Sequence, residues 1–282
     1  MIKKIKAICQ LYGIKPQRDK GQNFLINQEV IEKIIAAAGI LPEDIILEVG
    51  PGLGILTEAL IKKAKKVLSI ELDKNLFDFL KIKFKGAGNL ELINQDILKW
   101  RTTNSNAFDL NYKIVANLPY NITSIFLREF LSKDPKPSAM ILLLQKEVAE
   151  RICCQAGKMS LLAVSVQLYG SPEIIDLVPN SDFWPEPQVN SAILKISNIK
   201  SDKEVDVYLG DISVKQFWRV VKVGFSARRK QLSNNLAAGL KVEQKLVKNI
   251  LTGMNIDSDV RAQRLSVDDW LALAKNLRIY LN

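Results

Sequence analysis

Short apolar runs alternate with amphipathic stretches between residues 45 and 170, and this alternation restricts the folds that the chain can adopt. Five runs have the length and apolar content of buried strands: 45–49, 67–70, 90–94, 113–116 and 139–144. Helical periodicity precedes, separates or follows them, and it predicts helices at 30–38, 55–64, 122–130, 146–154 and 161–168. The sequence therefore predicts an α/β fold with a mostly parallel sheet.

The first predicted strand, 45–49, runs directly into a glycine-rich loop, Gly50-Pro-Gly52-Leu-Gly54. Glycines permit a tight turn and a close approach of ligand to backbone, at the sheet edge where α/β proteins bind ligands. The spacing differs from the G-x-G-x-x-G of dinucleotide-binding proteins, and the Lys-Ser/Thr of a P-loop is absent. A nucleoside ligand such as S-adenosylmethionine therefore fits better than a pyrophosphate, and a purely structural turn is the alternative.

Acidic residues follow the next two predicted strands. Glu71 ends the strand at 67–70 and lies 17 residues past Gly54, near the spacing at which an acid meets ribose hydroxyls in this topology. Asp96 follows the strand at 90–94 and could receive an adenine amino group. The alternatives are a surface acid or a helix cap.

Asn117-Leu-Pro-Tyr-Asn121 follows the strand at 113–116, and its residue types suit a flat ring that bears an amino group. The amide oxygen of Asn117 and the carbonyl of Leu118 are two acceptors for the hydrogens of one –NH2 group. Pro119 fixes the backbone, and Tyr120 supplies a ring face for stacking. An ordinary turn is the alternative, because Asn, Pro and Tyr are common in loops.

A second aromatic segment, Phe183-Trp-Pro-Glu-Pro-Gln-Val-Asn-Ser191, precedes an apolar strand at 192–196. Its two prolines stiffen the backbone, so Phe183 is expected to sit in a fixed place and could stack on a flipped-out base. An aromatic plug of a loop is the alternative.

The chain carries a net charge of +10, and its basic residues gather at the two ends. Residues 1–23 hold six Lys and Arg against one acid, and residues 213–282 hold thirteen against five. This segregation predicts a polyanionic partner, whereas two solvated basic surfaces are the alternative. With no histidine and three cysteines, the sequence predicts no metal site, no imidazole base and a reducing compartment.

A polar stretch at 101–112 predicts a loop, and the polar and charged stretch at 197–212 marks the expected domain boundary. The expected domains are a basic arm (1–23), an α/β domain (24–205) and an all-helical domain (206–282) with helices at 214–223, 231–237, 243–251 and 267–277. Arg228, Arg229 and Lys230 precede a helix start, where cations oppose the helix dipole, so they are expected to serve a partner. Neither a signal peptide nor a membrane span is expected.

Taken together, these motifs resemble the ribosomal RNA small-subunit adenine dimethyltransferases (KsgA/RsmA). The resemblance is carried by Gly21-Gln-Asn-Phe-Leu25, Glu48-Val-Gly-Pro-Gly-Leu-Gly54, Ile70-Glu-Leu-Asp73, Gln95-Asp96, Asn117-Leu-Pro-Tyr120, Phe183 to Ser191 and Arg228-Arg229-Lys230. It implies a Rossmann-like class I methyltransferase domain followed by a small helical domain. It also implies dimethylation of two adjacent adenosines near the 3′ end of 16S rRNA, with S-adenosylmethionine converted to S-adenosylhomocysteine, by a cytoplasmic monomer.

The resemblance also assigns site residues. Those expected to bind the cofactor are Asn23, Leu25, Gly50, Gly52, Glu71, Asp96 and Asn117. Those expected to hold the target adenine are Asn117, Leu118, Pro119, Tyr120 and Phe183, and those expected to bind RNA are Lys20, Arg228, Arg229 and Lys230. The chain departs from the family at Met159-Ser160, where Tyr-Gly is usual, so no function is assigned to 157–161.

Two alternatives compete with this interpretation. A large-subunit rRNA methyltransferase of the macrolide-resistance type usually has Lys at the position of Leu53 and Ile at the position of Leu118, so both residues favour the small-subunit enzyme. An RNA-binding assembly factor that keeps the fold without catalysis is disfavoured by the presence of Glu71, Asp96 and Asn117.

Overall fold

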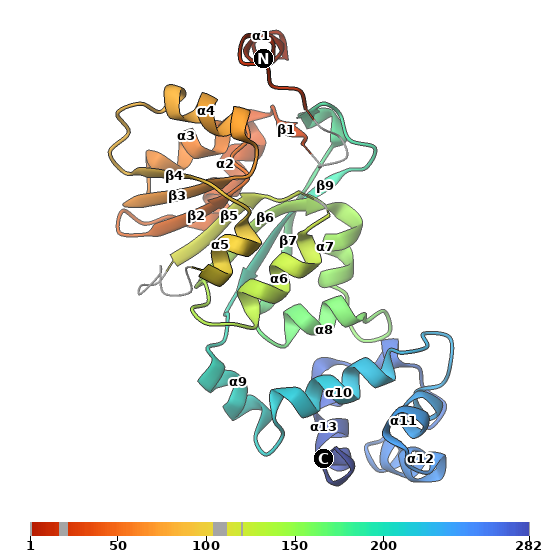
Figure 1. Ribbon diagram of the computed structural model, residues 1–282. Coiled ribbons are helices and arrows are strands. Elements are labelled where there is room, and N and C mark those ends of the chain that lie inside the picture. Colours follow the sequence, from red (N-terminus) through yellow and green to blue (C-terminus); the bar gives the residue numbers. More distant parts are fainter. Residues whose placement is uncertain (1, 17–21, 104–111, 120, 282) are drawn as a thin grey trace. The chain divides into compact units, whose positions relative to one another are not determined.

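The structure is a computed structural model that describes residues 2–16, 22–103, 112–119 and 121–281 (Figure 1). The chain divides into two compact units, one formed by 1–149 and 171–199 and the other by 150–170 and 200–282. Residues 150–170 group with the C-terminal helices partly because the backbone N–H groups of Gly157 and Met159 donate to the Gln263 carbonyl at 3.0 and 2.9 Å. The predicted domain boundary at 205/206 placed residues 150–170 in the α/β domain, whereas here they group with the C-terminal helices.

The first unit is built on a seven-stranded sheet in the order β4-β3-β2-β5-β6-β9-β7. Its parallel strands are β2 (Ile45–Val49), β3 (Lys66–Glu71), β4 (Leu90–Asn94), β5 (Tyr112–Asn117) and β6 (Ala139–Gln145). All five were predicted from their apolar runs. The topology confirms the predicted α/β class with a mostly parallel sheet.

Two antiparallel pairings complete the sheet, where β9 (Ser191–Ser197) lies between β6 and β7 (Ser171–Val178). The strand β7 was not predicted from the sequence; it contains Pro172 and a register shift between Ile174 and Asp176. Both features are typical of an edge strand, and they weaken the apolar alternation. The short strands β1 (Phe24–Leu25) and β8 (Phe183–Trp184) form a second, two-stranded antiparallel sheet. The 3-10 helix η2 (Asn180–Asp182) directly precedes β8.

Helices cover the sheet (Figure 1). They are α2 (Gln28–Ala38), α3 (Ile55–Ile61), α4 (Lys74–Lys83), α5 (Ile97–Thr103), α6 (Thr123–Leu131) and α7 (Lys146–Ile152). The helix α2 packs Ile31 and Ile34 against the strand residues Ile46 and Ile141 in one buried cluster. Asn27 caps α2, because its side-chain oxygen accepts from Glu29 N at 2.9 Å.

The N-terminal segment, predicted as a basic arm, contains an amphipathic helix, α1 (Ile2–Leu11). Its apolar face buries Ile5 and Cys9 in a cluster with Phe24, Leu53 and Phe79. The arm therefore has an apolar attachment to the first unit.

Helices occupy parts of two polar stretches. The loop predicted at 101–112 was wrong for residues 101–103 and for Tyr112, and residues 104–111 lie outside the described part of the chain. The helix α5 reaches Thr103 because Trp100 and Arg101 are buried. The helix α9 (Asp202–Leu209) begins at a capping box in which Ser201 and Glu204 exchange hydrogen bonds, a signature that is visible in the sequence.

The second unit is helical and begins with α8 (Leu161–Gln167), which Ser160 caps. After α9 come α10 (Val214–Gly224), α11 (Leu232–Leu240), α12 (Gln244–Gly253), η3 (Ala262–Arg264), α13 (Val267–Leu277) and η4 (Arg278–Tyr280). Trp270 on α13 is fully buried, and Gly224 on α10 makes room for it, because a Cβ at Gly224 would lie 2.3 Å from the ring.

Candidate functional site

A cavity of about 140 Å³ lies at the carboxyl ends of β2, β3 and β5 in the first unit. Ligands bind at this edge in open α/β sheets. The predicted residues that line the cavity are Asn23, Leu25, Gly50, Gly52, Glu71, Asn117 and Pro119. The structure thus gathers segments that lie up to 94 residues apart in the sequence.

The glycine-rich loop after β2 has a backbone that only glycine adopts without strain. Gly50, Gly52 and Gly54 have φ values of +65°, +57° and +71°. Gly54 N donates to Pro51 O at 2.8 Å, which closes the turn. A Cβ at Gly52 would lie 3.0 Å from the Phe24 ring, so the loop also needs glycine for packing.

Glu71 ends β3 with a buried carboxylate that points to the loop. Its Oε2 accepts from Gly52 N at 3.2 Å and its Oε1 accepts from Asp73 N at 2.8 Å. Burial raises the pKa of Glu71 to about 7, although the two backbone donors oppose the shift. Each oxygen keeps a further lone pair, so the group can still accept hydrogen bonds from a diol.

Glu48 is a cavity residue that the sequence analysis did not assign to the site. Its side chain is buried in β2, where Oε2 accepts from Thr57 Oγ1 and Ser69 Oγ, both at 2.8 Å. Its Oε1 is buried without a hydrogen-bond partner among the described residues. Burial raises the pKa of Glu48 to about 7. The signal in the sequence was one acid inside an otherwise apolar strand.

Asn117 ends β5 and has a fixed orientation. Its Nδ2 donates to Asn23 O at 3.2 Å, and since a carbonyl can only accept, the side-chain oxygen must face away from Asn23. Leu118 N donates to Leu143 O at 3.1 Å, which holds the turn to β6. Tyr120 lies outside the described residues, so its predicted stacking is not described.

Among the residues predicted for the cofactor and the target adenine, Leu118, Asp96 and Phe183 are absent from the described lining of the cavity. Asp96 caps α5, because its Oδ1 accepts from Leu98 N at 2.7 Å and Lys99 N at 3.3 Å. Phe183 is 2% exposed and packs in a buried apolar cluster. The same cluster contains Leu25 of β1, the residue with which Phe183 pairs. In this structure its ring has no open face, and its predicted role requires a local rearrangement.

Arg228, Arg229 and Lys230 lie in the second unit and are exposed. They occupy the turn before α11, which begins at Leu232. Buried Asn235 holds this turn by donating from Nδ2 to Gly224 O at 2.7 Å and Ala227 O at 3.0 Å. Lys20 lies outside the described residues.

The donor set around the cavity does not suit a metal ion. Among the described residues, no group of three or more His, Cys, Asp or Glu side chains is close enough to hold one. Within the same residues, no helix has both the length and the apolar character that a bilayer crossing requires.

Comparison with known proteins identifies the family. The family model described as "Ribosomal RNA adenine dimethylase" matches residues 14–278. The chain belongs to this family. The family confirms the predicted resemblance, and it makes the chain an rRNA adenine dimethyltransferase.

Individual relatives agree with this family. A protein named "Ribosomal RNA small subunit methyltransferase A" from Dehalococcoides mccartyi is 43% identical over 268 residues, which cover 95% of this chain and 90% of the relative. The crystal structure of a dimethyladenosine transferase from Plasmodium falciparum superposes with a TM-score of 0.76 at 28% identity, covering 91% of this chain and 98% of the other. A 23S rRNA methyltransferase, ErmE, gives a TM-score of 0.72 at 25% identity, covering 91% of this chain and all of the other.

Proposed function

We propose that this chain transfers methyl groups from S-adenosylmethionine to the N6 amines of two adjacent adenosines near the 3′ end of 16S rRNA during ribosome biogenesis. The observation that carries the proposal is that Asn117, Glu71 and the glycine-rich loop line one cavity at the carboxyl edge of the sheet. A family member with this arrangement has a place for a nucleoside cofactor and an acceptor for a target amine.

The residues present fit this cofactor. Glu71 would accept hydrogen bonds from the ribose hydroxyls, and the backbone of Gly50 and Gly52 would lie against the ligand. Asn23 and Leu25 would close the cavity from the β1 side. Asp96 would receive the adenine amino group; its Oδ1 already accepts from the backbone of α5, so Oδ2 is the oxygen assigned to this role. The cofactor supplies an electrophilic methyl group on a sulfonium.

The chain's contribution to chemistry is positioning and electrostatic stabilisation. Because Asn117 Nδ2 is held by Asn23, its Oδ1 is available to accept from the target N6. With the Leu118 carbonyl as second acceptor, the N6 lone pair would point away from both oxygens and toward the bound methyl donor. As the methyl group is transferred from sulfur to nitrogen, the proton on N6 would leave to solvent. No histidine is needed for this reaction, and the chain has none.

The second unit and the N-terminal segment are assigned to RNA. Exposed Arg228, Arg229 and Lys230, together with Lys20, would contact phosphates. The 16S rRNA 3′-end hairpin is the proposed target, and the protein would act as a cytoplasmic monomer without membrane contact. The assignment of 24–205 to catalysis and 206–282 to RNA binding belongs to this proposal.

The small subunit is favoured over the large subunit as the substrate. The 23S rRNA methyltransferase ErmE shares the fold at 25% sequence identity. The Dehalococcoides mccartyi relative is 43% identical, and it is named as a small-subunit rRNA methyltransferase. Leu53 and Leu118 also match the small-subunit pattern.

Incubation with labelled S-adenosylmethionine and either immature small subunits or naked rRNAs, followed by nucleoside analysis, tests the proposal. Dimethyladenosine at two adjacent sites in 16S rRNA is the expected product. Label in large-subunit rRNA would support the resistance-type activity instead. Retained RNA binding without label would indicate an assembly factor that has lost catalysis.

A further inference from the structure

Lys83, the last residue of α4, contacts the carbonyl groups of the glycine-rich loop. Its Nζ donates to Leu53 O at 3.0 Å and to Gly54 O at 3.1 Å. The Oε2 of Glu58, on the helix that follows the loop, lies 3.7 Å from the same Nζ. An ammonium group has three N–H donors, and Lys83 thus faces three acceptors from one loop and its helix.

The side chain is built into this position. It is 26% exposed, and its ammonium lies 4.9 Å from the centroid of the Phe84 ring. Phe84 and Leu80 also pack against Gly54, where a Cβ would lie within 2.7 Å of either side chain. The end of α4 therefore contacts the loop through both packing and hydrogen bonds.

The donor and acceptor groups of the loop have complementary partners. The N–H of Gly52 donates to Glu71, whereas the carbonyls of Leu53 and Gly54 accept from Lys83. With three glycines at positive φ, the loop has many alternative conformations when these partners are absent. Hydrogen bonds to Glu71 and from Lys83 together select the conformation whose backbone lines the cavity.

We propose that Lys83 is a positioning residue that preorganises the glycine-rich loop for S-adenosylmethionine; the inference rests on the proposed cofactor. It does not line the cofactor cavity among the residues described there, so its effect passes through the loop. Without the ammonium group, the glycine-rich loop would become ordered only when S-adenosylmethionine binds. The entropy cost of this ordering would lower the affinity for the cofactor.

Calorimetric titration of S-adenosylhomocysteine into Lys83→Met tests the proposal. Methionine keeps an apolar stem and removes the charge. Loss of charge-assisted hydrogen bonds predicts a dissociation constant about tenfold higher than in the wild type. The KM for S-adenosylmethionine should rise by a similar factor, with kcat at saturation and RNA affinity unchanged. Lys83→Arg, which keeps the donors, should recover part of the affinity.

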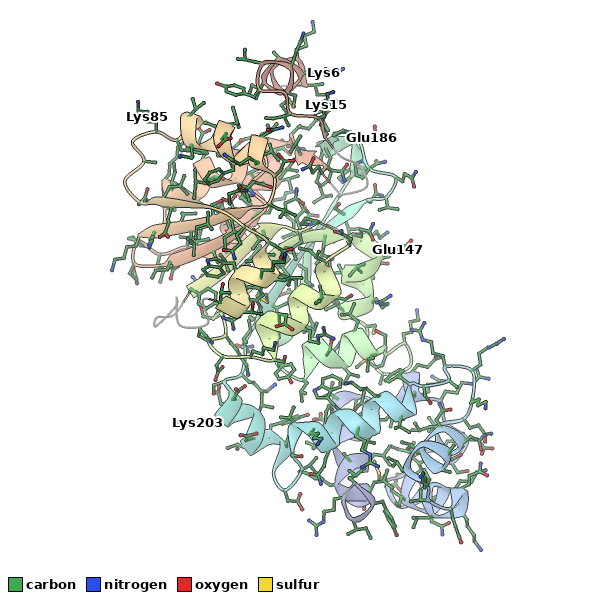
Figure 2. All side chains as sticks on the ribbon, in the orientation of Figure 1. Lys6, Lys15, Lys85, Glu147, Glu186 and Lys203 are labelled. Carbon is green, nitrogen blue, oxygen red and sulfur yellow. The ribbon has the colours of Figure 1, made fainter. Side chains whose placement is uncertain are left out.

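Lys85→Met is the matched control, because Lys85 is exposed and lies two residues further on (Figure 2). It should bind as the wild type does. If Lys83→Met only caused part of the protein to misfold, a smaller fraction of the molecules would bind the ligand. The measured stoichiometry would then fall, and the dissociation constant would stay unchanged. The inference is overturned if Lys83→Met binds within twofold of the wild type, or if Lys85→Met weakens binding equally. Failure of the wild type to bind would instead overturn the proposed cofactor.

Discussion

At the scale of single residues, the site depends on side chains whose orientation is set by neighbours. The amide of Asn117 is held by the Asn23 carbonyl, so its oxygen has one direction available. Glu71 is held by two backbone N–H groups. Such preorganisation means that the acceptors need not reorganise when the substrate arrives.

Replacing Asn117 by alanine should lower kcat by at least about 100-fold, because one of two acceptors for the target amine is lost. RNA binding should be largely retained. Single-turnover methylation of 16S rRNA measures the first quantity, and filter binding measures the second.

Asn121→Ala is the control for this variant, since Asn121 is exposed and lies in the same turn. It should methylate at the wild-type rate. A wild-type rate in Asn117→Ala would rule out the proposed mechanism.

At the scale of elements, the turn at 226–230 presents cations while Asn235 secures its backbone. The three charges precede α11, where no favourable dipole interaction stabilises them. An arrangement of this kind is suited to phosphate contacts.

The double variant Arg228→Ala/Arg229→Ala should weaken RNA binding and reduce the slope of log K against log salt by about 1 to 2, because fewer counterions are released. Binding measured at several salt concentrations gives this slope. Lys203→Ala, an exposed lysine on α9 of the same unit, is the control (Figure 2). If the double variant keeps the wild-type slope, these arginines lie outside the RNA footprint.

At the scale of the whole molecule, two buried acids couple the site to stability. Burial raises the pKa of Glu48 and of Glu71 to about 7, from 4.5. The folded state therefore keeps protons that the unfolded state releases between pH 4.5 and 7. The free energy of unfolding should fall as pH rises through this window and level off above it.

Glu48→Gln should flatten this dependence, because glutamine has no proton to lose. A shift of this size corresponds to at most about 3 kcal/mol, so the variant should lose clearly less stability than the wild type between pH 5 and pH 8. Urea unfolding of the ligand-free protein at each pH gives the values. Glu147→Gln changes the same charge at an exposed position and should follow the wild type (Figure 2). Parallel curves for Glu48→Gln and the wild type would contradict the prediction.

The sequence by itself determined the five parallel strands, the glycine-rich loop and the segment at 117–119 that ends β5. Apolar runs, glycine spacing and proline act through local backbone physics, and such signals are visible along the chain. The capping box of α9, Ser201 with Glu204, is equally a local signal of this kind.

Only the tertiary structure decided how distant segments meet. It brings Lys83 to the carbonyls of Leu53 and Gly54, buries Glu48 beside Ser69 and returns residues 150–170 to the helical unit. It also buries Phe183, which the sequence predicted as a stacking platform. Burial and hydrogen-bond partners arise from contacts between residues far apart in the sequence, and a local pattern carries no information about them.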